Sequence, residues 1–356
     1  MKETRRKSGF FFSVLAATSV LALLTLAGCT KEAPKPTANL TPYPLQIPLG
    51  LEKDYAKWIP ADNPLTTAKV NLGKILYFDP RLSGDGTISC ASCHTPKFGF
   101  GDNLQFSDGV KGRVGTRNSN TVLNRLYSTL QFWDGRAKSL EEQALGPVQN
   151  PVEMANSLPV MVASLQRIQR YKPLFREAFG TEEITADRVG KALASFERTL
   201  LSGNSAFDRF QAGDDQAISA SAKRGFAVFM SKGNCSQCHS LPNFTDEQFH
   251  NAGVGMNKPN PDLGRYMVTK NEADKGAFKT PTLREIAQTG PYFHDGSAKT
   301  LEEVVAVHAG GGRKNPNLDA KIKPLKLREQ EKRDLVAFMQ TLTGEPLKVE
   351  APELPE

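Results

Sequence analysis

The sequence contains two pentapeptides of one pattern, Cys90-Ala91-Ser92-Cys93-His94 and, further along the chain, Cys235-Ser236-Gln237-Cys238-His239. Cys-x-x-Cys-His is the signature of covalent attachment of c-type haem. In this motif the two thiols bond the vinyl groups of the porphyrin, and the histidine is the proximal ligand of the iron. One match could be a thiol redox pair, whereas two matches indicate a protein with two covalently bound haem c groups.

The N-terminus has the features of an export signal. Four basic residues between positions 2 and 7 precede an uncharged, largely apolar stretch over 8–30, which is the order of a secretory signal peptide. A permanent membrane anchor is the alternative, because the stretch approaches the length of a membrane span. Leu26-Ala27-Gly28-Cys29 resembles the bacterial lipobox and favours the signal. We predict a lipoprotein signal peptide over 1–28, lipidation of Cys29, and a periplasmic protein anchored to a bacterial membrane by lipid alone.

Composition limits the remaining choices. The five cysteines are divided between four thioethers and one lipid, so we expect no disulfide. Residues 29–49 carry five prolines, which favours a tether that does not pack. The chain has 45 Lys and Arg against 38 Asp and Glu, a net charge of +7, and part of this excess lies in the signal. So small an excess fits an ordinary solvated surface and gives no indication of nucleic-acid binding.

A weak internal repeat predicts two domains. Residues 68–78 and 222–230 precede the two haem motifs, and both have apolar residues at helical spacing with a glycine ahead of an aromatic. One amphipathic helix is expected at the end of each half, over 184–201 in the first and over 329–342 in the second. The fold class is therefore all-α, with two cytochrome c-like domains that each bind one c-type haem. We place the domains at 50–203 and 204–345, with a linker over 204–220 and a surface tail over 346–356.

The histidine count bears on the first iron. Only five histidines occur in the chain, and His94 and His239 are the proximal ligands. No histidine lies between them, so the first haem lacks a second histidine ligand within its own domain. Methionine could bind there, although it is more often core filler; the candidates are Met154, Met161 and Met230. We predict an open iron site at the first haem, where peroxide can bind.

The second domain offers more candidates for the ligand opposite His239. Each of its three further histidines, taken alone, is more often structural than ligating; they are His250, His294 and His308. Together they favour a histidine ligand to the second haem, with Met256 and Met267 as competitors.

From about Ala61 to Gly344 the chain resembles the bacterial di-haem cytochrome c peroxidases and their relatives, which include the di-haem enzyme that matures the tryptophylquinone of methylamine dehydrogenase. Four motifs carry this resemblance: Gly115-Thr116-Arg117-Asn118-Ser119, Gln131-Phe132-Trp133-Asp134-Gly135-Arg136-Ala137, Glu142-Gln143-Ala144 with Gly146-Pro147-Val148, and Pro291-Tyr292-Phe293-His294-Asp295-Gly296.

The resemblance implies roles for individual residues. Glu153 matches the distal acid–base glutamate of the peroxidatic haem, Gln143 its amide companion, and Trp133 the tryptophan that carries electrons between the haems. The resemblance also implies one calcium ion, bound by Asn118 and by the backbone carbonyls of Thr289 and Pro291, an oxygen-only set that suits a hard cation.

The chemistry expected of Glu153 follows from elementary principles. Cleavage of bound peroxide needs a base that moves a proton from one oxygen to the other. Burial raises the pKa of a carboxyl group, which lets it act as an acid as well. Pro147 and Pro151 argue against one regular helix that carries both Gln143 and Glu153, so we expect a loop over the haem.

The sequence departs from the peroxidase pattern at two positions. Val110 stands where the peroxidases have a histidine that blocks the first iron until reduction frees it, so we predict a five-coordinate haem at rest. His308 stands where the peroxidases have methionine and the cofactor-maturing relative has tyrosine. Bis-histidine ligation lacks the potential-raising effect of methionine. His250 and His294 have no ligand role in the family pattern, and we interpret both as structural.

Three functions remain open. The first is a peroxidase that reduces hydrogen peroxide at the N-terminal haem, with electrons passed through the C-terminal haem from a small cytochrome c or cupredoxin. The second is a related oxidase that uses peroxide to oxidise a protein or organic substrate, which Val110 and His308 favour. The third is a non-catalytic electron carrier, against which Glu153 and Gln143 argue. Because the peroxidases of this family are commonly dimers, a homodimer is also expected.

Overall fold

The computed structural model describes residues 37–356, and helices dominate this range. In chain order the α-helices are α1 (Thr67–Phe78), α2 (Cys90–Cys93), α3 (Leu140–Gln149), α4 (Leu158–Arg167), α5 (Tyr171–Phe179), α6 (Ala186–Glu197), α7 (Ala206–Gln211), α8 (Ala220–Met230), α9 (Tyr266–Thr269), α10 (Leu301–Ala309) and α11 (Glu329–Gln340). The described sheet is one antiparallel pair, β1 (Phe249–His250) with β2 (Phe278–Lys279). The all-α prediction is confirmed.

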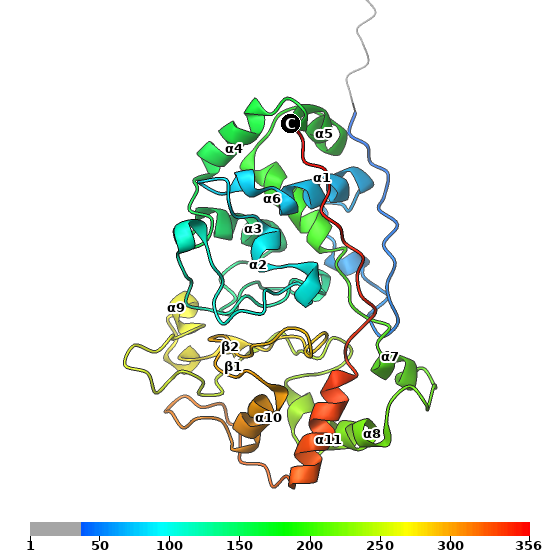
Figure 1. The fold of residues 1–356 in the computed structure, drawn as a ribbon, viewed down its shortest axis with the longest axis vertical. Helices are drawn as coiled ribbons and strands as arrows, with labels where there is room; N and C mark the ends of the chain where they lie inside the picture. The colour runs from blue at the N-terminus through cyan, green and yellow to red at the C-terminus, as the bar shows by residue number, and fades with distance from the viewer. Residues whose placement is uncertain (1–36) are drawn as a thin grey trace, which may run out of the picture. The chain divides into compact units, whose positions relative to one another are not determined.

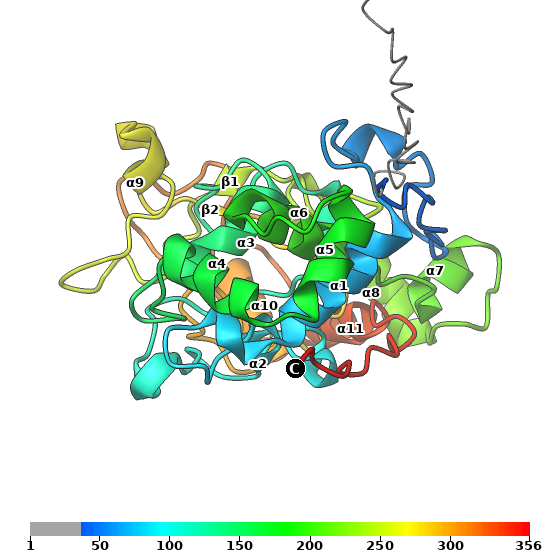
Figure 2. The same ribbon diagram turned by 90° about the horizontal axis from the view of Figure 1, so that it is seen from above.

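The first domain is built on the crossing of α1 and α6. A Cβ at Gly73 would lie 1.9 Å from the carbonyl oxygen of Ala192 and 2.9 Å from the Cβ of Phe196, so only glycine allows the two helices to approach this closely. Tyr77 stacks edge-on against Phe196 with ring centroids 5.2 Å apart. Viewed from above, α3, α4 and α5 gather beside this pair (Figure 2). The expected helices over 68–78 and 184–201 are thereby confirmed, the second one shorter.

The second domain repeats the same crossing with α8 and α11, which lie side by side (Figure 1). A Cβ at Gly225 would lie 1.8 Å from the carbonyl oxygen of Asp334 and 2.9 Å from the Cβ of Phe338. Gly225 and Phe338 are thus equivalent to Gly73 and Phe196. Phenylalanine dominates this core: Phe207, Phe226, Phe229 and Phe244 all lie with ring centroids within 6.2 Å of Phe338. The internal repeat seen in the sequence is a repeat of packing.

The segment at the N-terminal edge of the described range differs from the predicted tether. Residues 37–49 lie against the first domain: the N–H of Asn39 donates to the carbonyl of Glu177 at 2.7 Å, and that of Tyr43 to Leu65 at 3.1 Å. Leu45 is buried in the first core. The prolines remove backbone donors but leave these apolar side chains free to pack, and composition alone misses this. Residues 1–36, with the predicted signal peptide and Cys29, lie outside the described residues.

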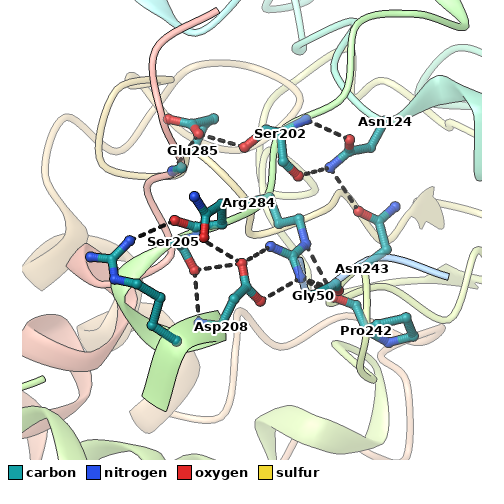
Figure 3. Close-up of polar contacts among 12 residues, drawn as sticks. Gly50, Asn124, Ser202, Ser205, Asp208, Pro242, Asn243, Arg284 and Glu285 are labelled. Carbon is teal, nitrogen blue, oxygen red and sulfur yellow. Dashed lines mark hydrogen bonds and ion pairs between the residues drawn. The ribbon is translucent and has the colours of Figure 1, made fainter. Parts of the chain in front are cut away.

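The predicted linker over 204–220 also differs, because it contains α7. Ser205 caps this helix and Asp208 completes a capping box. Asp208 forms a buried ion pair with Arg284, whose guanidinium also donates to the carbonyls of Gly50 and Pro242 (Figure 3). The segment that joins the domains is therefore fixed by its own polar contacts.

Asn124 of the first domain extends this contact region. Its side chain donates to the carbonyl of Ser202 at 3.1 Å and to the side chain of Asn243 at 3.2 Å (Figure 3). The predicted surface tail returns to the first domain, where Leu347 and Val349 pack against the first core and Arg81 donates to the carbonyl of Pro355. Within residues 37–356, none of the helices has the length and apolar character needed to cross a bilayer.

Candidate functional site: two haem pockets

The first Cys-x-x-Cys-His motif lines a cavity of about 710 Å³ in the N-terminal domain. Helix α2 is a single turn, which turns the thiols of Cys90 and Cys93 to the same cavity. The Oη of Tyr77 donates to the His94 carbonyl at 2.7 Å, and the His94 Nδ1 donates to the carbonyl of Phe100 at 3.2 Å. Such a bond orients the ring and leaves Nε2 free to bind a metal. Burial lowers the pKa of His94, which keeps the imidazole neutral as a ligand must be.

The predicted distal residues lie in the same cavity. Helix α3 ends at Gln149 and Glu153 lies in the turn over 151–154, so the expectation that one regular helix does not carry both Gln143 and Glu153 is confirmed. Pro147 does not end the helix, because it is accommodated inside α3. Gln143 and Glu153 both line the cavity. The structure therefore brings together an amide and a carboxyl group that the sequence separates by a helix end.

The environment of Glu153 sets its proton affinity. Burial raises the pKa of this carboxyl group, while the charge of Arg136 and a hydrogen bond from Asn150 oppose the rise. That hydrogen bond, from the Asn150 Nδ2 to the Glu153 Oε1, is 2.6 Å long. A carboxyl group held in this way can accept a proton and return it within the cavity.

Three buried polar atoms that line this cavity have no hydrogen-bond partner within the described residues: Gln143 Oε1, Arg125 Nη2 and Glu197 Oε2. Buried polar groups are nearly always satisfied, so such atoms indicate a missing partner. A haem brings carboxylates that accept from a guanidinium, and iron-bound species that an amide can contact. Together with Cys90, Cys93 and His94, this set of side chains fits a covalently bound haem c.

Trp133 lies where the two domains meet. Its Nε1 donates to the carbonyl of Asn118 at 2.8 Å, and its own carbonyl accepts from the N–H of Lys279 in the second domain at 2.8 Å. The indole is buried and lines the first cavity. The position agrees with a residue between two haems, while its role in electron transfer remains a prediction.

The second motif lines a smaller cavity of about 110 Å³ with mostly apolar walls. His239 and His308 both line it. The Nδ1 of His239 donates to the carbonyl of Phe244 at 3.0 Å, which orients this ring as His94 is oriented in the first domain. Burial and the neighbouring His239 lower the pKa of His308 to about 4, so His308 is neutral. Two neutral imidazoles with two cysteines fit a bis-histidine haem c.

Of the methionines considered as iron ligands, Met154 alone lines a haem cavity among the described residues. Met161 is packed in the first core and Met230 is 47% exposed, whereas Met154 is buried and lines the first cavity. In the second domain Met267 is 53% exposed, and the residues that line the second cavity include His308 but not Met256.

The two remaining histidines have structural surroundings. His250 lies between two carboxylates, with Nδ1 2.5 Å from Asp319 and Nε2 2.8 Å from Asp246. His294 stacks on Phe278 with ring centroids 3.6 Å apart. These contacts agree with the structural interpretation of both residues.

The calcium prediction stays a prediction. The N–H of Asn118 donates to the carbonyl of His294 at 2.8 Å, which places it near the chain segment that follows Pro291. The Nδ2 of Asn118 donates to the carbonyl of Leu104 at 2.9 Å. No contact of the described residues tests whether Asn118, Thr289 and Pro291 share one ion.

Sequence reasoning missed Asn150, Arg125 and Glu197. A signal for Glu197 was available, because it lies four residues after Leu193 and therefore falls on the apolar face of its helix. No comparable signal marks Arg125, which reaches the cavity from the 3₁₀ turn Arg125–Tyr127.

Comparison with known proteins agrees with this site. The family described as di-haem cytochrome c peroxidase matches residues 67–216, and the family described as cytochrome c matches residues 222–343. The methylamine utilization protein MauG of Methylorubrum extorquens is 48% identical over 299 residues, which cover 83% of this chain and 84% of that protein. The cytochrome c551 peroxidase of Nitrosomonas europaea is 42% identical, over 83% of this chain and 86% of its own length.

One solved structure has a similar fold. A MauG-like protein associated with microbial copper homeostasis superimposes with a TM-score of 0.75 at 32% identity, over 83% of this chain and 96% of its own. The protein thus has two cytochrome c-like domains with two haem c groups, and it is an oxidoreductase that acts on peroxide. The chain belongs to the di-haem cytochrome c peroxidase family.

Proposed function

We propose that the protein reduces hydrogen peroxide to water in the N-terminal cavity, with electrons that enter through the C-terminal domain from a small cytochrome c or cupredoxin. The observation that carries this proposal is the pair of Glu153 and Gln143 in the cavity that His94 lines. The balanced reaction consumes one peroxide, two electrons and two protons and yields two waters. The haem supplies the iron that binds peroxide and exchanges electrons.

The side chains of this protein supply the protons and the orientation. With haem bound, Glu153 would accept a proton from one oxygen of peroxide and return it to the other oxygen, which would then leave as water. Asn150 keeps the carboxyl group in place through its 2.6 Å hydrogen bond. The unpartnered Gln143 Oε1 accepts a hydrogen bond from peroxide or from the departing water without adding a charge.

Access to the metal is the second requirement. Val110 is buried and offers an alkyl group where the related peroxidases have a blocking histidine. We infer that the oxidised protein reacts with peroxide directly and needs no prior reduction.

A second candidate function is the use of peroxide to oxidise a protein or an organic substrate. His308 supports it, because a bis-histidine haem lacks the potential-raising methionine and is a poorer acceptor of electrons from an ordinary cytochrome c. The 48% identity to a methylamine utilization protein points the same way.

Steady-state assays separate the two candidates. Rapid oxidation of reduced cytochrome c or cupredoxin by peroxide supports the first. Peroxide consumption that proceeds only with an organic or protein substrate, and not with either reduced carrier, supports the second. We propose further that the mature protein is periplasmic, carries a lipid on Cys29, binds one calcium ion and forms a homodimer.

A further inference from the structure

The two domains place different residues at one equivalent position of their haem cavities. Gly73 faces Phe196 as Gly225 faces Phe338, with the same 2.9 Å approach of the hypothetical Cβ. The residue after the phenylalanine is Glu197 in α6 and Met339 in α11. Each lines the cavity of its own domain. The N-terminal cavity therefore has a carboxyl group where the C-terminal cavity has a thioether.

The buried position of Glu197 is energetically unfavourable for a charged carboxylate. The residue is 4% exposed, and its Oε2 has no hydrogen-bond partner within the part of the chain that the structure describes. An unpaired buried charge destabilises a fold far more than a buried methionine does. Met339 demonstrates that an apolar side chain fits the same position in this fold. A gain in stability therefore does not explain why a glutamate occupies position 197, and a functional role of its ionisable carboxyl group does.

The groups around Glu197 act on its carboxylate in opposite directions. Arg198, the residue that follows the last residue of α6, forms an ion pair with Glu141 at 2.7 Å. Arg125, from the 3₁₀ turn, attracts the carboxylate but forms no hydrogen bond with it in the described contacts, and Glu141 repels it. Tyr77 from α1 is the remaining titratable group nearby, and burial raises its pKa and keeps it uncharged. Cys90 from α2 also lies nearby, but its sulfur has no ionisable proton once it is bonded to haem. Burial dominates and raises the pKa of Glu197 to about 7.

We propose that Glu197 takes up a proton from solvent when the N-terminal haem iron is reduced and releases it when the iron is oxidised, and thereby tunes the reduction potential of that haem. The step balances: iron(III), one electron, a carboxylate and one proton give iron(II) and a carboxylic acid. The electron comes from the protein's donor or from an electrode. Met339 leaves the C-terminal haem without this coupling. The inference rests on haem binding in the first cavity and adds to the proposed function.

The sign of the effect follows from charge. Iron(III) carries one more positive charge than iron(II), so the oxidised haem favours the carboxylate and the reduced haem favours the acid. Between the two resulting pKa values of Glu197, the potential falls as pH rises. The ratio of oxidised to reduced haem at a fixed potential then changes about tenfold per pH unit, which is 59 mV for one electron.

The test is a spectroelectrochemical titration of the holoprotein without peroxide, over about pH 5 to about pH 9, where this carboxyl group titrates. Glu197→Gln keeps the shape of the side chain and removes its charge, and Glu197→Met installs the residue of the equivalent position. We expect the potential of the N-terminal haem to depend on pH in the wild type and to be independent of pH near neutrality in both variants. At the alkaline end, the potential of the variants should be higher.

Glu153→Gln is the matched control, because it removes the other carboxyl group of the same cavity. It should keep the pH dependence. A slope that persists in Glu197→Gln, or that disappears in Glu153→Gln alone, overturns the proposal. The titration involves no turnover, so failure of the peroxidase proposal and failure of this one are distinguishable.

A second measurement does not depend on how the variants fold. The infrared difference spectrum of the wild type, reduced minus oxidised, should contain the C=O stretch of a newly protonated carboxylic acid near neutral pH. Absence of that band contradicts proton uptake by a buried carboxyl group.

Discussion

Val110 and Glu153 are joined through the backbone, since the N–H of Val110 donates to the carbonyl of Glu153 at 2.8 Å. Val110 is only 3% exposed. The segment in which the resemblance implies a blocking histidine for the peroxidases is therefore tied here to the backbone of Glu153, the proposed acid–base residue, and it carries an alkyl group that cannot bind iron. This contact supports the proposed open iron site, because the fold itself holds the segment with Val110 next to Glu153.

Val110→His should close that site. The resemblance implies an iron-binding histidine at this position, so we expect the oxidised N-terminal haem to become low-spin and its reaction with peroxide to require prior reduction. Electron paramagnetic resonance of the oxidised protein checks the ligation. Val110→Leu is the control for bulk, and it should keep the wild-type spin state. An N-terminal haem that stays high-spin in Val110→His would show that this segment does not face the iron.

Glu153→Gln should lower kcat/KM for peroxide by about 10²–10⁴-fold, the usual contribution of a positioned acid–base group. Both haem spectra should remain unchanged. In the wild type, kcat/KM should fall as pH decreases through the pKa of Glu153, which burial raises above its ordinary value, because only the carboxylate accepts a proton. This acid limb should disappear in the variant. An unchanged kcat/KM in Glu153→Gln assigns the base elsewhere.

His308→Met should raise the reduction potential of the C-terminal haem and keep it low-spin, because a thioether favours the reduced iron more than an imidazole does. His250→Gln is the control: both ring nitrogens of His250 lie against carboxylates, so the ligation of this haem should not change. Redox titration measures both variants. A low-spin signal that survives unchanged in His308→Ala excludes His308 as the ligand.

Arg284→Met tests the contact region between the domains. The variant leaves Asp208 buried without its partner, and breaking a buried ion pair costs about 3–5 kcal/mol. Chemical denaturation should report a loss of this size, with part of it recovered in Arg284→Met combined with Asp208→Asn. Lys332→Met removes an exposed ion pair with Glu329 and should leave stability unchanged within error. If Arg284→Met and Lys332→Met lowered the free energy of unfolding equally, the structural role of Arg284 would be contradicted.

The sequence predicts most of the fold because its strongest signals are local. The haem motifs and the amphipathic helices over 184–201 and 329–342 need only spacing and periodicity, and the structure reproduces both helices as α6 and α11. Gly73 and Gly225, the glycines ahead of Phe78 and Phe226, lie at the two helix crossings. The atom closest to each is a backbone carbonyl oxygen of the opposite helix, which the sequence does not identify. Such long-range partners become visible only in three dimensions.

The remaining features depend on contacts between distant segments. Asp208 looks like part of a polar linker until its partner Arg284 is known. The segment over 37–49 and the tail pack because the first domain offers them an apolar surface, which composition does not report. Arg125 enters the first cavity from a turn with no periodicity to mark it. Glu197 could have been found, because its place on an apolar helix face matches that of Met339.

The vacant coordination position at the first iron is the central claim, and the spin state of each haem in the oxidised protein tests it most directly. Electron paramagnetic resonance at low temperature should give one high-spin signal from the haem that His94 holds and one low-spin signal from the bis-histidine haem. Addition of peroxide should then remove the high-spin signal without prior reduction. Two low-spin signals, with no response to peroxide, would contradict the account.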